Sequence, residues 1–232
     1  LHVAKKPPFK GKFEWAIDYY KSMAKKLNIT MKLGKEVTAQ EVLALKPHSI
    51  LVATGSNVIS IPLEGLDQVQ TVQAHDVLAN DMQFANKKVV VIGGGITGLE
   101  TALYINRQGT NQVSVVDMLP EWPVDMLDMR YQNEALLEVR HCNDQGVALF
   151  YNNKVVKFAD GKLFIESTKD GEAKALPADV IVLSVGVKPN DALWQELLAS
   201  GHPSVWKAGD AIATGKINKA VLHGSKFGYS LN

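Results

Sequence analysis

Glycines interrupt the apolar sequence KKVVVIGGGITGLETAL at the point where a strand would end and a helix begin. Gly93, Gly95 and Gly98 have the spacing Gly-x-Gly-x-x-Gly, which brings backbone close to a dinucleotide diphosphate. Gly93 permits the tight turn, Gly95 gives room for the ligand, and Gly98 lets the helix pack on the strand. The N–H groups of Ile96 and Thr97 would open the helix and face the phosphates. We therefore expect backbone binding of a dinucleotide, and we identify no catalytic side chain.

An acidic residue closes the next expected strand, QVSVVDML. Asp117 lies nineteen residues after Gly98, where a carboxylate accepts hydrogen bonds from the adenine-ribose 2′-hydroxyl. A 2′-phosphate would be repelled by this carboxylate, and no Arg stands within five residues of it. We place Asp117 and the following Met118 in the cofactor site, and we expect NAD(H) to be favoured over NADP(H).

Composition excludes several other classes of function. The 232 residues include 25 Lys and Arg and 24 Asp and Glu, so the net charge of +1 argues against nucleic acid or a membrane surface as partner. No apolar run approaches the roughly 20 residues of a spanning helix. Cys142 is the single cysteine, which excludes a disulfide reductase and a cysteine-ligated metal centre, and the histidines show no metal-site spacing. We expect a cytoplasmic protein without a metal site.

Helix and strand patterns alternate along most of the chain, while residues 56–86 read as irregular apart from one short helix. Thr38 with Glu41 predicts a capping box, and Asp160-Gly161 predicts a hairpin turn. The expected helices are 13–27, 38–45, 74–80, 96–108, 129–146, 191–200 and 217–231. The expected strands are 29–33, 49–55, 88–92, 112–119, 147–152, 154–167 as a hairpin, 173–177, 178–186 and 204–210. This alternation predicts an α/β fold with Rossmann-like parallel sheets and a small antiparallel meander.

Two similar segments explain why the glycine turn lies so far from the first residue. SILVATGSN and DVIVLSVGVKPN are both apolar strands that end at a glycine, Gly55 and Gly186. Gly186 lies 93 residues after Gly93, so a similar unit closed by Gly55 would have its own glycine turn about 38 residues before Leu1. Residues 1–52 contain no such turn. The chain is therefore expected to be a fragment whose first nucleotide unit lacks its phosphate loop.

Together these segments resemble the flavoproteins with two dinucleotide-binding domains. The greatest likeness is to the C-terminal region of the NADH:flavin oxidoreductases, the 2,4-dienoyl-CoA reductase and trimethylamine dehydrogenase branch of the old yellow enzyme group. The motifs that carry it are PPFKGKF at 7–13, ILVATG at 50–55, VVVIGGGITGLETA at 89–102, VVDMLPE at 115–121, SVGVKPN at 184–190 and AGDA at 208–211.

The resemblance implies a pyridine nucleotide domain inserted in a truncated FAD-binding domain. Residues 71–189 would bind NAD(P)H, and residues 1–70 with 190–232 would form the partial FAD-binding domain. The cofactor contacts that it implies are Ala53, Thr54, Gly55, Gly209 and Asp210 against FAD, and Gly186 beside NAD. Branch members of the trimethylamine dehydrogenase type carry ADP in place of FAD, so ADP is an alternative. Glu100 is left with two interpretations, facing the flavin edge or neighbouring phosphates, or acting as a first-turn acid that favours the helix dipole.

The implied function is an NAD(P)H:flavin oxidoreductase, which passes a hydride from NADH to FAD and feeds an N-terminal FMN and iron–sulfur reductase part that this sequence does not contain. The alternative is a structural module that binds NAD or ADP without redox activity. A self-contained short-chain dehydrogenase is disfavoured, because no Tyr downstream of the glycine turn is followed by the Tyr-x-x-x-Lys lysine.

Overall fold

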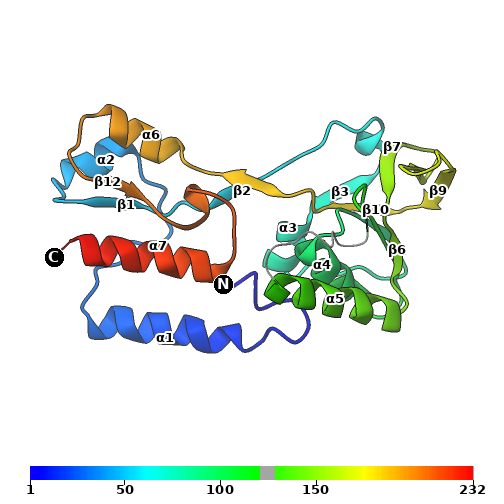
Figure 1. Cartoon of the computed structure of the whole chain (residues 1–232), viewed down its shortest axis with the longest axis horizontal. Helices are drawn as coiled ribbons and strands as arrows, with labels where there is room; N and C mark the ends of the chain where they lie inside the picture. The colour runs from blue at the N-terminus through cyan, green and yellow to red at the C-terminus, as the bar shows by residue number, and fades with distance from the viewer. Residues whose placement is uncertain (121–128, 232) are drawn as a thin grey trace. The chain divides into compact units, whose positions relative to one another are not determined.

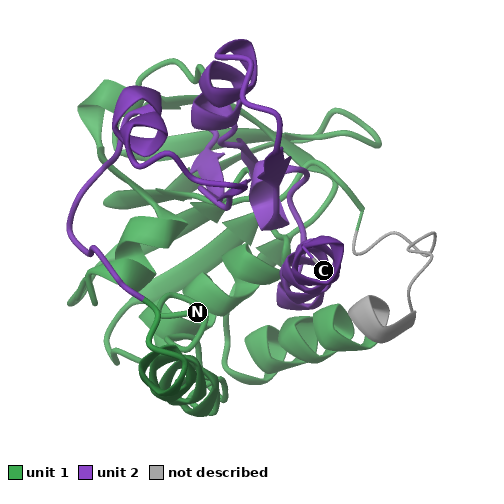
Figure 2. Ribbon diagram, turned by 90° about the vertical axis from the view of Figure 1, so that its left-hand side faces the viewer, with its two compact units in different colours: residues 1–29, 60–185 green, residues 30–59, 186–232 purple. Residues whose placement is uncertain are grey.

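The computed structural model describes residues 1–120 and 129–231. The chain divides into two compact units, and each unit is built from two separate stretches of sequence (Figure 1, Figure 2). Unit 1 comprises residues 1–29 and 60–185, and unit 2 comprises residues 30–59 and 186–232. Each unit therefore depends on contacts between residues that lie far apart in the chain.

The elements alternate along the described sequence, as the α/β prediction requires. The helices are α1 (Phe13–Lys26), α2 (Ala39–Ala44), α3 (Ala74–Ala79), α4 (Ile96–Asn106), α5 (Met129–Asp144), α6 (Ala192–Ala199) and α7 (Ile217–Ser230), with short 3-10 turns η1 (Leu66–Gln68) and η2 (Gly209–Ala211). The strands are β1 (Ile50–Val52), β2 (Ser56–Val58), β3 (Gln70–Gln73), β4 (Lys88–Ile92), β5 (Gln112–Val116), β6 (Ala148–Phe150), β7 (Asn153–Ala159), β8 (Lys162–Ser167), β9 (Ala173–Pro177), β10 (Val180–Leu183), β11 (Val187–Pro189) and β12 (Val205–Lys207).

Unit 1 contains a parallel sheet of five strands in the order β3-β10-β4-β5-β6. Its central strands are apolar at almost every position because both faces are covered. Val89 and Val91 of β4 pack in the cluster that includes Leu99 and Leu103 of α4. The helices α3, α4 and α5 lie on this side of the sheet (Figure 1). Each buried Val or Leu side chain contributes about 1.5–3 kcal/mol, so this layer fixes α4 against the sheet.

The alternate residues of the same strands face a different layer. Val90 and Ile92 belong to a second cluster with Phe158 and Leu163, which come from the meander β7-β8-β9. Asp160 and Gly161 join β7 to β8, and their φ angles of 50° and 70° are those of the predicted tight hairpin turn. The predicted α/β class, with a parallel sheet and a small antiparallel meander, is confirmed.

Unit 2 has a smaller core around two short pairings of strands. β1 pairs with β12 in parallel, and β2 pairs with β11 in antiparallel fashion. Ile50 and Val52 of β1 pack with Leu197 of α6. Thr38 caps α2, and its side chain and Glu41 bond reciprocally to each other's backbone, so the predicted capping box is confirmed.

Two expectations for the secondary structure are wrong. Residues 29–33 form no strand, and Ile29, Met31 and Leu33 are exposed, because no described segment pairs with this stretch. The region 56–86 is not irregular, since it contains β2, η1 and β3 as well as the expected helix α3. β3 has the sequence QTVQ, and such a short polar strand becomes ordered only by pairing with β10. Among the described helices, none combines the length and apolar character that a bilayer crossing demands.

Candidate functional site

Gly93 occupies a turn that a side chain would block. It follows β4 with a φ of 108°, a conformation that L-residues rarely adopt. Its N–H donates to the carbonyl oxygen of Val116 over 2.8 Å, and a Cβ at this position would collide with the backbone of Ser184. Gly93 therefore lies between the ends of β5 and β10, the two strands that flank β4.

Gly98 and Gly95 have different local surroundings. A Cβ on Gly98 would strike the carbonyl oxygen of Gly93, so only glycine lets α4 lie this close to the strand that precedes it. A Cβ on Gly95 would meet no atom within 4 Å. Gly95 is also the N-cap of α4, and no side chain caps the helix there. The first turn, with Ile96 and Thr97, thus presents open backbone donors to an incoming anion, and this arrangement fits a diphosphate.

Asp117 is held by the glycine turn. Its Oδ2 accepts from the N–H of Gly94 over 2.6 Å, and its Oδ1 accepts from the N–H of Leu119 over 2.8 Å. A carboxylate has about four acceptor sites, so each oxygen can accept a further hydrogen bond from a ribose hydroxyl. Asp117 is half-buried and Met118 is 62% exposed beside it. The last residue of the predicted VVDMLPE motif, Glu121, lies outside the described residues.

In unit 2, a backbone turn follows β1 at the predicted flavin contact. Gly55 has a φ of 75°, and its carbonyl oxygen accepts from the N–H of Asn190 over 3.0 Å. The hydroxyl of Thr54 donates to the carbonyl oxygen of Asn190, while Ala53 and Thr54 are exposed. Exposed backbone after a buried strand is compatible with a flat cofactor lying against it.

A second turn in unit 2 carries the Gly-Asp motif. The Oδ1 of Asp210 accepts from the N–H of Gly215 over 3.0 Å, and its Oδ2 lies 3.5 Å from the hydroxyl of Ser56. The N–H of Gly209 donates to Nδ1 of His223 over 3.2 Å. Asp210 is half-buried and acceptor capacity remains on its carboxylate, so it fits a ligand with hydroxyl groups.

Gly186 begins the return of the chain to unit 2. Its φ is 103°, and its carbonyl oxygen accepts from the N–H of Ile59 over 3.1 Å. A Cβ there would meet only the Ile59 side chain, at 3.9 Å. Because Gly186 belongs to unit 2 and the glycine turn to unit 1, its predicted approach to NAD stays a prediction.

Glu100 lies beyond the first turn of α4, so it is not the first-turn acid that the sequence suggested, and its place at the flavin edge or at neighbouring phosphates stays a prediction. It is 7% exposed in α4, and its carboxylate pairs with the ammonium group of Lys10, which also bonds Glu134 over 3.0 Å. Burial raises the pKa of Glu100, and the charges of Glu138 and Glu134 act in the same direction, while Lys10 opposes them. This buried pair fastens the segment before α1 to the helix of the glycine turn.

Two further observations concern nucleophile and metal chemistry. Cys142 is fully buried against α4, and burial raises the pKa of its thiol to about 12, so it is not a nucleophile at neutral pH. Among the described residues, no three His, Cys, Asp or Glu side chains gather as a metal site would require.

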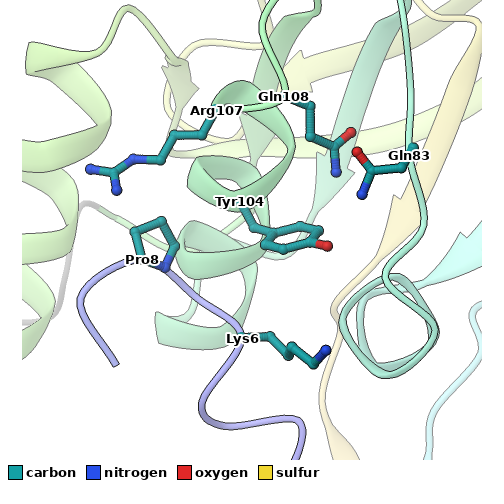
Figure 3. A pocket seen from close by; sticks show the side chains of 6 residues that line it. All are labelled: Lys6, Pro8, Gln83, Tyr104, Arg107 and Gln108. Carbon is teal, nitrogen blue, oxygen red and sulfur yellow. The ribbon is translucent and has the colours of Figure 1, made fainter. Parts of the chain in front are cut away.

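A hollow of about 280 Å³ lies elsewhere in unit 1 (Figure 3). Its lining residues are Lys6, Pro8, Gln83, Tyr104, Arg107 and Gln108. The charged ends of Lys6 and Arg107 point away from each other in Figure 3. Lys6 pairs with Asp81, and the guanidinium group of Arg107 lies 4.4 Å from the ring centre of Phe9. The cations are thus directed to partners in the protein rather than to a common ligand.

Comparison with known proteins identifies the family. The family model described as pyridine nucleotide-disulphide oxidoreductase matches residues 13–223. The chain belongs to this family. Membership supports binding of a pyridine nucleotide and FAD, and it covers both the glycine turn and the Gly-Asp turn.

The curated relatives of this chain carry the names of oxidoreductases. The chain is 29% identical over 239 residues to an NADH oxidase of Thermoanaerobacter brockii, covering 100% of this chain and 35% of the relative. It is 32% identical over 190 residues to a bilirubin reductase of Mediterraneibacter gnavus, covering 82% of this chain and 28% of the relative. The chain therefore spans about a third of the length of these curated relatives.

Solved structures agree with this placement. A 2-naphthoyl-CoA reductase has 26% identity and a TM-score of 0.86, over 98% of this chain and 33% of that one. Histamine dehydrogenase from Rhizobium sp. 4-9 shares the fold, with a TM-score of 0.80 at 20% identity over 97% of this chain and 37% of that one. The resemblance that the motifs indicated is confirmed.

The second and third glycines of the turn, Gly95 and Gly98, should respond differently to alanine. Gly98→Ala is expected to lower the free energy of unfolding by about 3 kcal/mol, because its Cβ would overlap the Gly93 carbonyl oxygen. Gly95→Ala should change it by no more than about 1 kcal/mol, since it meets open space. Urea unfolding of both variants measures this contrast, and equal losses of stability would contradict the described packing.

The raised pKa of Glu100 predicts a pH-dependent stability. A carboxyl group with a pKa above its ordinary value of 4.5 stabilises the folded state most below that pH, and this contribution is lost as pH rises through the folded pKa. The unfolding free energy of the wild type minus that of Glu100→Gln should therefore fall as pH rises from 4.5 toward neutrality. Lys10 stays protonated throughout, because its pKa is raised from 10.5. If this difference in unfolding free energy increased with pH instead, the attraction of Lys10 for the Glu100 carboxylate would outweigh the cost of burying its charge.

Proposed function

We propose that this chain is the nucleotide-binding region of an NAD(P)H-dependent flavin oxidoreductase. Family membership supports the two cofactor classes, and the names of the relatives support reductase activity. The observation that carries the proposal is the open first turn of α4 at Gly95, next to an acid that the same turn holds in place. A diphosphate and an adenine ribose match these two features.

The residues of the chain bind and align the cofactors. In the proposed site, the amides of Ile96 and Thr97 and the helix dipole hold the NADH diphosphate, and Gly93 and Gly98 fix the position of that helix. When both cofactors are bound, they supply the chemistry, a hydride transfer from NADH to the flavin. Alignment of the cofactors requires no acid or base from the protein, in keeping with the proposal that no side chain is catalytic.

We assign the two cofactors to different parts of the chain. Residues 71–189 would bind the pyridine nucleotide, and residues 1–70 with 190–232 would contribute part of the FAD site. Ala53, Thr54 and Gly55 would lie against the FAD, and Asp210 after Gly209 would accept from its ribityl hydroxyls. Gly186 would lie close to the NAD. These roles rest on motif positions, on the exposed backbone at Ala53 and Thr54, and on the remaining hydrogen-bond acceptor capacity of Asp210.

We further propose NAD(H) as the preferred nucleotide. Asp117 would accept from the adenine-ribose 2′-hydroxyl and repel a 2′-phosphate, with Met118 packed beside it. In the flavin half, FAD is the proposed occupant, and ADP is the alternative.

The relatives are about three times as long as this chain, so a larger protein is the proposed context. We propose that an FMN and iron–sulfur part of the same protein receives the electrons. The second candidate is a module that binds NAD or ADP without redox activity. The small core of unit 2 favours this candidate. Among the described strands of unit 2, β1 and β12 form the only parallel pair.

Steady-state oxidation of NADH separates these two candidates. The purified chain is mixed with NADH, added FAD and a dye acceptor, and the rate is compared with that of free FAD under the same conditions. A rate above that of free FAD supports the oxidoreductase. A rate equal to it, with NADH binding retained, supports the binding module instead.

Replacement of Asp117 tests the proposed cofactor preference. Asp117→Ala should reduce the ratio of NADH to NADPH affinity by about tenfold or more, because it removes a charge-assisted hydrogen bond and a source of repulsion. Asp117→Asn is the matched control, since it removes the charge but retains an acceptor, and it should strengthen NADPH binding with a smaller loss for NADH. Dissociation constants from fluorescence titration measure both. An unchanged ratio in Asp117→Ala would contradict this role.

A further inference from the structure

Gly94 is the position that the Gly-x-Gly-x-x-Gly pattern leaves open to any residue, yet the structure constrains it on two sides. A Cβ added to Gly94 would lie 3.0 Å from Cε1 of Tyr151 and 3.1 Å from Cβ of Asp117. Both contacts are tighter than ordinary van der Waals packing allows. Neither flanking glycine has this surrounding, since Gly93 meets backbone and Gly95 meets open space.

The three residues come from the ends of neighbouring strands. Gly94 follows β4, Asp117 follows β5 and Tyr151 follows β6, and these strands are adjacent in the sheet. The backbone of Asp117 cannot easily retreat from its neighbours. Its N–H donates to the carbonyl oxygen of Phe150, and its own carbonyl oxygen accepts from the N–H of Asn153, each over 2.9 Å.

The carboxylate of Asp117 is oriented by the backbone N–H of Gly94. The N–H of Gly94 donates to Oδ2 over 2.6 Å, and the charge of the acceptor strengthens this hydrogen bond. The Tyr151 ring edge lies against Gly94 on the side from which a Cβ would project. The missing Cβ thus leaves room for both the ring edge of Tyr151 and the side chain of Asp117 beside Gly94.

We propose that Gly94 and Tyr151 are positioning residues that orient the Asp117 carboxylate and thereby determine the preference for NADH over NADPH. The proposal rests on the function proposed above, in which Asp117 faces the adenine ribose. A carboxylate held in one orientation both accepts from the 2′-hydroxyl and repels a 2′-phosphate. Tyr151 acts through Gly94, whose N–H holds the carboxylate. A carboxylate released from Gly94 does both less well, so the affinity for NADH falls while that for NADPH falls less or rises.

Dissociation constants for NADH and NADPH in a set of variants test this proposal. Gly94→Ala and Tyr151→Ala should each lower the ratio of NADH to NADPH affinity by about tenfold, the effect of one charge-assisted hydrogen bond. The double variant should lower the ratio by less than the product of the two, because the added methyl group can enter the space that the ring vacates. Tyr151→Phe should restore most of the ratio lost in Tyr151→Ala, since the ring carbon makes the contact.

Two controls separate orientation from general damage to the site. Gly95→Ala places a methyl group where the diphosphate would lie, so it should weaken NADH and NADPH alike and leave their ratio unchanged. Tyr104→Ala removes another partly buried tyrosine that packs on the same core cluster, and the ratio should again be unchanged. Urea unfolding of every variant identifies those that are folded. If Gly94→Ala does not fold, Tyr151→Ala still tests the proposal.

Different results overturn different statements. If the unaltered chain prefers NADH and Tyr151→Ala keeps that ratio while folded, the positioning role is wrong and the proposed function stands. The positioning role is equally wrong if Tyr104→Ala changes the ratio as much as Tyr151→Ala. If the unaltered, folded chain binds neither nucleotide, the proposed function is overturned, and the positioning role falls with it.

Discussion

The close approach of α4 to the end of β4 is the constraint on which the rest of unit 1 depends. Gly98 lies against the carbonyl oxygen of Gly93, at a distance that no side chain permits. This contact points the first turn of α4, with its free donors, at the edge where the parallel strands end. It also places Gly93 between Val116 and Ser184, so the turn is built into the sheet rather than appended to it.

The layers of unit 1 explain why such a contact persists. β4 alternates between two clusters, with Val89 and Val91 toward the helices and Val90 and Ile92 toward the meander. A shift of one residue would exchange the two faces, so the register of the strand is strongly determined. The pair formed by Lys10 and Glu100 connects α4 to a distant part of the chain. The site is therefore held by packing on both faces of the strand.

The sequence predicts those features that depend on local patterns. The glycine spacing, the capping box at Thr38 and the turn at Asp160-Gly161 follow from backbone needs of neighbouring residues, and each is found as expected. The expectations for residues 29–33 and for β3 are wrong because strand formation depends on a partner that local sequence does not specify. The ion pair of Glu100 and the contact of Tyr151 with Gly94 join residues 90 and 57 positions apart, so nothing in either segment reveals them.

The central claim is that the amides opening α4 hold the diphosphate of NADH. Its most direct test is a titration of NADH into the folded chain, followed residue by residue through the backbone amide signals in nuclear magnetic resonance. We expect saturable binding, between about 1 µM and 1 mM, with the largest shifts at Gly95, Ile96 and Thr97. AMP, which lacks the diphosphate bridge, should shift Asp117 more than these amides. A folded chain with no saturable shifts, or with shifts confined to residues away from α4, would contradict the claim.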